Sequence, residues 1–178
     1  MHKSMLLLAL SALAGVCQGA PKPADVPQAA QSYVLVKEPK EKSDPLLCEA
    51  AAFLEKNNVI YLATCDGQSP RVRPVRYTTI MDNKLAVATS TKKELSQQIE
   101  KNPNVEVSSS AADGSAFVRF KGKAVACKDA DVKAKFLAGH PKFQKMFGEN
   151  LVVYLIEPEM VGIFPLKGGQ AKTKTYVK

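Results

Sequence analysis

The sequence predicts a mainly β fold with short helices, arranged as an antiparallel barrel or sandwich. Short apolar runs such as "VIYLATC" recur along the chain and are separated by turn residues such as "DGQSP", a pattern typical of antiparallel strands. Apolar residues at helical spacing occur in only a few short stretches. The chain has neither a GxGxxG nor a P-loop motif, so a dinucleotide-binding βαβ fold is not indicated.

Two segments at the start of the sequence are expected to lie outside the folded domain. Residues 1–20 combine a short basic start with the apolar run "MLLLALSALAGV", which predicts a cleaved signal peptide and is too short for a membrane span. Residues 21–42 are rich in Pro, Ala and Lys and predict a linker. The folded domain is then expected at 43–166, with a C-terminal tail at 167–178. We expect the mature protein to be periplasmic or secreted, without a membrane span.

The folded domain is expected to begin with a helix and two strands. Ser43 is the expected N-cap of the helix, and Pro45 lies in its first turn, a common arrangement at helix starts. The run at 59–65 predicts the first strand, and "SPRVRPVRYTTI" at 69–80 predicts the second. Because Pro74 cannot donate to a ladder, the second strand should lie at an edge, at a bulge, or beside something other than a strand.

Hairpins with helical insertions are expected to complete the sheet. The tight turn "MDNK" leads into "LAVATS", which makes this run the expected hairpin partner of 69–80. Thr91 should cap the next helix with Glu94 completing a capping box, and Asn102 precedes the proline that ends it. The remaining expected elements are the strands "VEVSSS" and "SAFVRFKGKAVAC", a helical region at 129–147 interrupted at His140, and the strands "LVVYLIEP" and "MVGIFPL".

Charge and cysteine content narrow the function classes. The net charge of +8 is compatible with an anionic partner or simply with a solvated basic surface. The lysines are scattered and aromatic residues make up only 7% of the chain, so no nucleic-acid partner is expected. Cys48, Cys65 and Cys127 each sit in an apolar run without a CxxC motif. We therefore expect buried thiols rather than a disulfide, a nucleophile or a metal site.

The end of "LAVATS" has the composition of an anion site. Thr89 and Ser90 offer hydroxyl groups, and Lys92 and Lys93 follow at the expected start of a helix, where free amides and ammonium groups favour a phosphate. The alternative is an ordinary helix cap with surface lysines.

The arginine-rich stretch strengthens the case for a ligand. As hairpin partner of "LAVATS", it should bring Arg73 within one strand pair of Thr89. Such a strand can present its backbone to a flat heteroaromatic ligand while an arginine holds a phosphate, or it can be an edge strand protected by its charges against aggregation. Strand alternation gives two faces, with Arg71, Arg73 and Val75 on one and Val72, Pro74 and Arg76 on the other.

The string "YLATCDGQSPRVRPV…KLAVATSTKKELSQQIEKNPNVEV…FVRFKGKAV" resembles the FMN-binding split-barrel family of pyridoxamine 5′-phosphate oxidase-like proteins. It is most similar to the small single-domain members with an "RVRP" strand, over roughly residues 49–165. The resemblance implies a six-stranded antiparallel split β-barrel that forms a homodimer, with FMN at the subunit interface. Glu94 and Leu95 replace a basic pair of the vitamin B6 oxidases, and the tail lacks histidine, so oxidation of pyridoxamine phosphate is not expected.

The resemblance also implies roles for individual residues. Arg73 would approach the FMN phosphate and ribityl chain, while Pro74 and Val75 would place backbone against the isoalloxazine ring. Three residues match the phosphate-binding strand end and turn, namely Thr89, Ser90 and Lys93. Gln98 matches a glutamine of the following helix, which contacts the cofactor or only supports the loop. Arg119 or Lys121 would reach the flavin from the other subunit.

The expected function is that of an exported FMN-binding flavoprotein. It would be an oxidoreductase that uses a nicotinamide or another electron donor on an unidentified small molecule, with no residue required as acid or base. His140 would either line the pocket or lie on a surface loop. The alternative is a non-catalytic split-barrel protein that binds flavin, haem or no cofactor.

Overall fold

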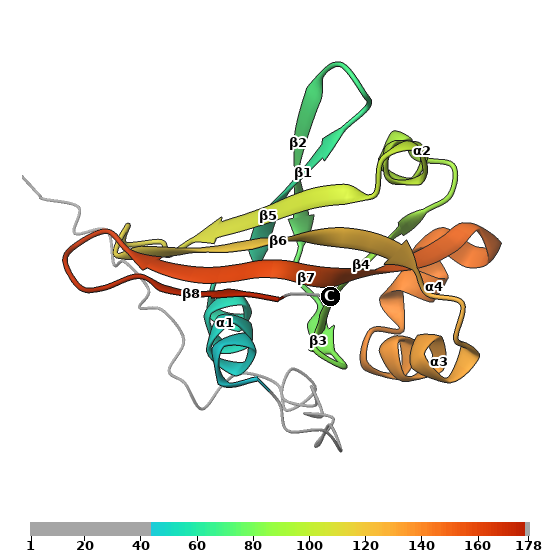
Figure 1. Ribbon diagram of the computed structural model, residues 1–178. Coiled ribbons are helices and arrows are strands. Elements are labelled where there is room, and N and C mark those ends of the chain that lie inside the picture. The colour runs from blue at the N-terminus through green and yellow to red at the C-terminus, as the bar shows by residue number, and fades with distance from the viewer. Residues whose placement is uncertain (1–43, 177–178) are drawn as a thin grey trace, which may run out of the picture. The chain divides into compact units, whose positions relative to one another are not determined.

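The computed structural model describes residues 44–176, in which eight strands form one sheet and four short α-helices lie around it (Figure 1). The strands are β1 Val59–Cys65, β2 Pro70–Arg76, β3 Thr79–Met81, β4 Lys84–Ser90, β5 Asn104–Ser110, β6 Ala116–Ala126, β7 Leu151–Pro165 and β8 Lys172–Thr175. The helices are α1 Pro45–Lys56, α2 Glu94–Lys101, α3 Ala130–Gly139 and α4 Lys142–Phe147, followed by a 3₁₀ turn at Gly148–Asn150. The expected signal peptide and most of the linker, at 1–20 and 21–42, lie outside the described residues.

The order of the strands explains the curl of the sheet. The path runs β2-β1-β5-β6-β7-β4-β3, with β8 paired to β7 and all pairs antiparallel. Only Tyr77 and Thr78 separate β2 from β3, although these strands lie at opposite ends of the path. Because a chain advances at most about 3.8 Å per residue, the sheet must curl until its two edges approach each other. The predicted split barrel is confirmed, with eight strands where six were expected.

The first helix packs into the core of the barrel. Leu47, Ala50 and Leu54 form its buried face, since residues three or four apart share one side of a helix. They belong to the same apolar cluster as the inward side chains of the sheet. Asp44, rather than Ser43, caps this helix, and its side chain accepts a hydrogen bond from the Leu46 amide at 3.0 Å.

The stretch expected as one strand at 69–80 is divided in two. After β2 the chain crosses through Tyr77, which is 7% exposed and whose amide donates to the Asn58 carbonyl at 2.8 Å. Thr78 then donates through its hydroxyl to the Ala86 carbonyl, and β3 pairs with β4. The prediction that the arginine strand is the hairpin partner of β4 is therefore wrong: β2 pairs with β1, where Arg73 lies opposite Leu62.

The start of α2 also differs from the prediction. Lys93 is the N-cap residue, without a side-chain hydrogen bond, so the predicted Thr91 cap and capping box are wrong. A tight turn follows β4 instead, in which Ser90 Oγ accepts from the Lys92 amide at 3.2 Å and the Ser90 carbonyl accepts from the Lys93 amide at 3.0 Å. The helix ends at Lys101, as the following Asn-Pro pair predicts.

The last two expected strands are one continuous strand, β7. Its pairing with β6 shifts by one residue, so that Lys121 lies opposite Met160 but Gly122 lies opposite Pro158. A bulge is one of the few places where a sheet accepts proline, which is why Pro158 does not end the strand. Within the expected tail, β8 pairs with β7; no strand is expected there from the sequence.

The cysteines are less buried than expected. Cys48 is exposed on α1, and Cys65 and Cys127 are half-buried; all three are free thiols. The prediction of buried thiols is thus wrong for Cys48, because it occupies the side of α1 away from the buried face. Of the helices between residues 44 and 176, none is long and apolar enough to cross a membrane.

Candidate functional site

The curl of the sheet creates a groove of about 550 Å³ between segments that are not neighbours in the strand order. It is lined by Arg73, Pro74, Val75 and Arg76 of β2, Ala88 and Thr89 of β4, Lys93, Glu94 and Leu95 at the start of α2, and Lys142, Phe143, Met146 and Phe147 of α4. The volume is in the range of small-molecule sites, about 300–1,000 Å³. Arg73 and Thr89 therefore do line one site, although β3, and not the strand that carries Arg73, is the hairpin partner of β4.

The groove is strongly electropositive. Its described lining contains four cationic side chains and a single carboxylate, that of Glu94. Two of the cations also lie over aromatic rings: Lys93 Nζ is 5.0 Å from the centre of the Phe147 ring, and Lys142 Nζ is 5.5 Å from that of Phe143. A groove of this composition favours an anionic ligand with a flat apolar part.

One wall of the groove is the free edge of the sheet. In the described chain β2 pairs only with β1, so of the three settings expected for Pro74 the structure shows the edge strand. Strand alternation is also as predicted: Arg73 and Val75 are half-buried, whereas Pro74 and Arg76 are exposed. The unpaired side of an edge strand retains backbone donors and acceptors, and here these groups lie beside the groove.

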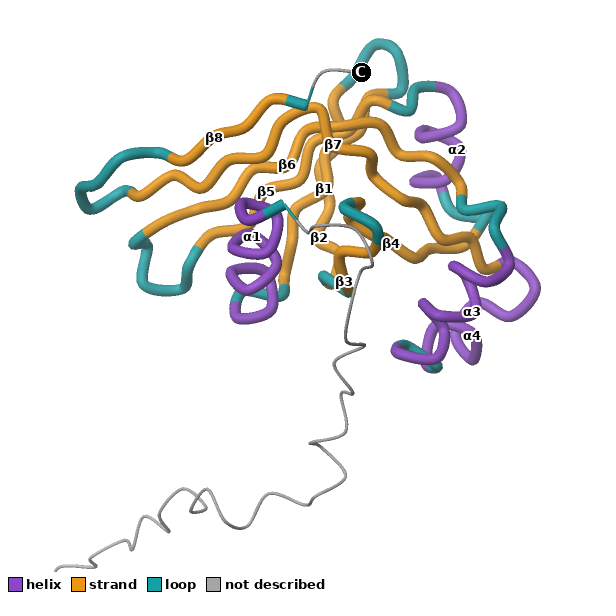
Figure 2. Tube along the Cα trace, turned by 60° about the horizontal axis from the view of Figure 1, so that its bottom comes forward, coloured by secondary structure: helices purple, strands orange, loops and turns teal. Residues whose placement is uncertain are grey.

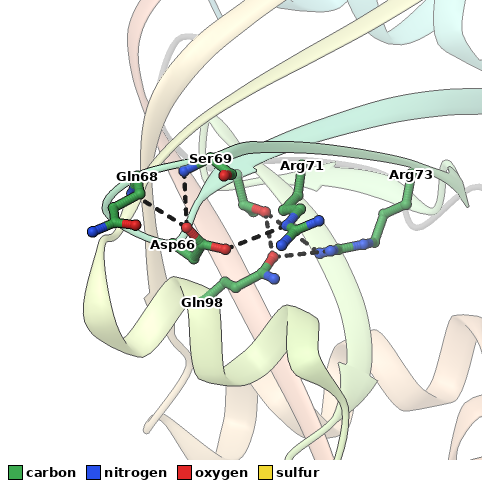
Figure 3. A network of polar contacts seen from close by, with 7 residues as sticks. Asp66, Gln68, Ser69, Arg71, Arg73 and Gln98 are labelled. Carbon is green, nitrogen blue, oxygen red and sulfur yellow. Dashed lines mark hydrogen bonds and ion pairs between the residues drawn. The ribbon is translucent and has the colours of Figure 1, made fainter.

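Arg73 donates hydrogen bonds to two buried polar side chains, those of Thr64 and Gln98. Its Nη2 donates to Gln98 Oε1 at 2.9 Å (Figure 3), and its Nη1 donates to Thr64 Oγ1 at 3.4 Å. The Thr64 hydroxyl in turn donates to the same Gln98 oxygen at 2.7 Å. Gln98 thus supports Arg73 and is not among the residues that line the groove.

The neighbouring Arg71 is held differently. Its Nε donates to Asp66 Oδ2 at 3.3 Å, and Asp66 Oδ1 also accepts from the amides of Gln68 and Ser69 (Figure 3). The two backbone hydrogen bonds, followed by that from Arg71, lower the pKa of Asp66 below its ordinary value. The charge of Arg71 is therefore compensated at the β1–β2 turn, and Arg71 does not line the groove.

Two further predicted site residues lie outside the groove. Ser90 is buried and uses its Oγ to accept from the amide of Lys92, so it shapes the turn beside the groove. Arg119 pairs with Glu106 across β5 and β6, and Lys121 pairs with Glu159 at 3.6 Å. Neither Arg119 nor Lys121 lines the groove of its own chain.

Sequence reasoning missed the contribution of α4. Phe143, Met146 and Phe147 form its apolar wall, but their spacing indicates only a helix and does not show which part of the barrel the helix meets. His140 does not line the groove; it packs against Phe136 at 5.0 Å between ring centres. Burial, followed by the charge of Lys142, lowers the pKa of His140. Residues 44–176 contain no cluster of His, Cys, Asp or Glu that would hold a metal ion.

Comparison with known proteins identifies one matching family model and several solved structures of the same fold. The family model described as pyridoxamine 5'-phosphate oxidase matches residues 46–162. A NimC/NimA family protein from Clostridium acetobutylicum is 27% identical, with a TM-score of 0.65 over 73% of this chain and 92% of that protein. A search of curated proteins found no significant match.

Two other solved structures share the fold at lower identity. One is a pyridoxamine 5'-phosphate oxidase-related, FMN binding protein from Nostoc punctiforme, 15% identical with a TM-score of 0.59 over 78% of this chain and 100% of that one. The other is a heme binding protein from Mycobacterium smegmatis, 19% identical with a TM-score of 0.60 over 76% of this chain and 60% of that one.

Proposed function

Since the chain belongs to the pyridoxamine 5'-phosphate oxidase family, whose model matches residues 46–162, we propose that it binds FMN in the groove and acts as an FMN-dependent oxidoreductase. The observation that carries this proposal is the convergence of Arg73, Thr89 and Lys93 beside the free edge of β2. An FMN binding protein among the structures of the same fold adds support.

The residues present fit the cofactor. A phosphomonoester needs cationic and hydroxyl donors, which Arg73, Lys93 and Thr89 offer at one place. A flat ring system needs an apolar surface and backbone groups at its edge, which α4 and the unpaired side of β2 offer. Because four cations face one carboxylate in the described lining, the phosphate end of the ligand has the electrostatic advantage.

The side chains of the groove bind and orient rather than move protons. When bound, FMN supplies the redox chemistry, which the protein shapes through access and local charge. Among the described lining residues there is no His, Cys or Tyr, and Glu94 is the one carboxylate. The substrate is then a small molecule that enters beside α4, with a nicotinamide or another compound as electron donor. Export of the mature chain stays a prediction from residues 1–20.

The alternative is a binding protein without catalysis. A heme binding protein shares the fold, and Glu94 occupies a place where a basic residue would assist an anionic cofactor. Haem iron is usually held by His, Cys, Met or Tyr, and Met146 is the one such residue in the described lining. This lining supports haem less well than FMN.

We further propose that the protein forms a homodimer through the outer face of β1 and β2. Val59, Tyr61 and Val72 are among the few large apolar side chains that are exposed, at 48%, 51% and 64%, and such a patch often marks an interface. The register places Tyr61 and Arg119 in one row across β1, β5 and β6, so Arg119 lies on the same face. Light scattering should give twice the monomer mass; a monomeric mass would contradict this proposal.

FMN titration of the purified mature protein tests the proposed function. Flavin absorption and quenching of flavin fluorescence should report a complex, and the double variant R73M/K93M should abolish FMN retention because it removes two of the phosphate-binding cations. The matched control R71M/K101M removes two exposed cations that do not line the groove and should retain FMN.

The outcomes separate the candidates. Unchanged retention in R73M/K93M would show that the groove is not the flavin site. A haem absorption band would favour the binding-protein alternative with haem, and a colourless protein that does not bind added FMN would favour the alternative without a cofactor.

A further inference from the structure

Arg73 stands apart from the other arginines in how it is held. Arg71 and Arg119 pair with carboxylates, and Arg76 is exposed and donates to an amide oxygen of Asn58 at 3.2 Å. Arg73 is half-buried and donates to two neutral oxygens, those of Thr64 and Gln98. Within residues 44–176 it forms no ion pair.

Thr64, Arg73 and Gln98 form a closed triangle of hydrogen bonds that joins β1, β2 and α2. Figure 3 shows the hydrogen bond between Arg73 and Gln98. Thr64 is 3% exposed and Gln98 is 8% exposed, so neither side chain is free to change its position without loss of a buried hydrogen bond. Arginine has only hydrogen-bond donors, and the Thr64 hydroxyl also acts as a donor toward Gln98. The Gln98 amide must therefore present its oxygen to both, which fixes its orientation.

The triangle leaves the charge and most donors of Arg73 available. A guanidinium has five N–H donors, and two of them point to Thr64 and Gln98. Because both acceptors are neutral, the positive charge is not compensated, in contrast to Arg71 beside Asp66. The remaining donors belong to a side chain that lines the groove.

We propose that Gln98 and Thr64 are positioning residues that keep Arg73 ordered and uncompensated, so that the groove selects a phosphomonoester over the same ligand without its phosphate. This inference deepens the proposed FMN function and rests on it for the identity of the ligand. It assigns to Gln98 a role that does not require contact with the cofactor.

The first experiment needs no flavin. Inorganic phosphate is titrated into the full protein while the side-chain ¹⁵N–¹H signals of Arg73 are followed by NMR. In wild type a resolved, ordered Arg73 signal should shift on binding. The variant Q98L should broaden this signal and weaken phosphate binding about tenfold or more, as the loss of one charged hydrogen-bond anchor implies. The control Q97L makes the same substitution at the adjacent, exposed glutamine and should behave as wild type.

A second variant separates order from charge. Q98E keeps an acceptor for Arg73 but adds a compensating carboxylate, so the Arg73 signal should stay ordered while phosphate binding still falls. T64V, which removes the other acceptor, should resemble Q98L and provides the test if Q98L does not fold. Phosphate binding that is equal in wild type, Q98L and Q98E, or absent from wild type, would overturn the proposal.

The second experiment compares FMN with riboflavin. Q98L should lose affinity for FMN about tenfold while riboflavin affinity changes less than about twofold, because the two ligands differ only in the phosphate. Equal losses for both ligands would mean that Gln98 is merely structural and would overturn the inference. If the wild type binds phosphate more tightly than Q98L does but does not bind FMN, the proposed function is wrong and this inference is still supported.

Discussion

The three arginines of β2 have the same charge but different surroundings. Arg71 is paired with Asp66 at 3.3 Å and is more than half exposed, so its interaction contributes little net stability and is screened by salt. Arg76 also lines the groove, but it is exposed and donates to the Asn58 side chain. Arg73 is half-buried beside neutral oxygens, where its charge is screened less. This is why Arg73 is the arginine best suited to an anionic ligand.

Asp44 links the first helix, α1, to the C-terminal strand β8 and to the residue that follows it. Its side chain caps α1 and accepts a hydrogen bond from Lys174 of β8. It also accepts a hydrogen bond from the Tyr176 hydroxyl at 3.1 Å. Burial alone would raise the pKa of Asp44, but the hydrogen bonds from Lys174, the Leu46 amide and Tyr176 outweigh burial and lower the pKa below its ordinary value. The ionised form of Asp44 therefore stabilises the docking of β8 on α1.

The stability that this charge contributes should depend on pH. A carboxyl with a depressed pKa in the folded state stabilises the fold above its unfolded pKa, and this contribution is lost as the pH falls through the folded value. D44N keeps a capping side chain but removes the charge, so we expect it to be less stable than wild type at pH 7. Urea unfolding should show this difference shrinking toward zero as the pH falls toward 2.

A second substitution controls for the helix cap. D44A also removes the cap and should be about 1 kcal/mol less stable than D44N at both pH values. A difference between D44N and wild type that does not change with pH would mean that the charge of Asp44 plays no part.

Among the elements, those with local sequence patterns were predicted best. The bounds of β1 at Val59–Cys65 follow directly from its apolar run, and the turn before β4 follows from Asp82 and Asn83, whose positive φ angles of 47° and 59° suit these residue types. The division between β2 and β3 was not predictable. It depends on the hydrogen bond from Tyr77 to Asn58, a partner that no pattern within 69–80 reveals.

The long strand β7 depends on the bulge opposite Gly122. A Cβ atom added to Gly122 would lie 2.0 Å from the Glu157 carbonyl oxygen, and neither backbone segment can move freely because both lie inside the ladder that joins β6 to residues 154–165 of β7. The glycine therefore lets the two strands approach at the point where Pro158 interrupts the ladder.

This contact predicts a large effect for a small substitution. G122A should lower the free energy of unfolding by about 3 kcal/mol, the size of effect seen when a packed region is overfilled. The control G139A adds the same methyl group near the end of α3, where no atom lies within 4 Å, and should change stability by less than about 1 kcal/mol. Equal unfolding free energies for the two variants in denaturant titrations would contradict this view of the bulge.

On the scale of the whole domain, the site exists because the barrel closes. The sequence indicated Arg73, Pro74, Val75, Thr89 and Lys93, and all five line the groove. A hairpin was expected to bring them together, whereas the structure does so through a curled sheet whose two edge strands, β2 and β3, are separated by only two residues in the chain. Tertiary closure of this kind leaves no periodic pattern in the sequence. The packing of α4 against β4 leaves none either; Figures 1 and 2 show α4 near one end of the sheet.

The central claim is that this groove receives a phosphate-bearing flat ligand, with its anionic end at Arg73, Thr89 and Lys93 and its ring along the free edge of β2. A crystal structure of the protein grown with excess FMN tests this claim most directly. We expect density for the phosphate within hydrogen-bond distance of those three side chains, with Gln98 still bonded to Arg73 behind them. Flavin density elsewhere on the protein, or a groove filled by side chains at saturating FMN, would contradict the account.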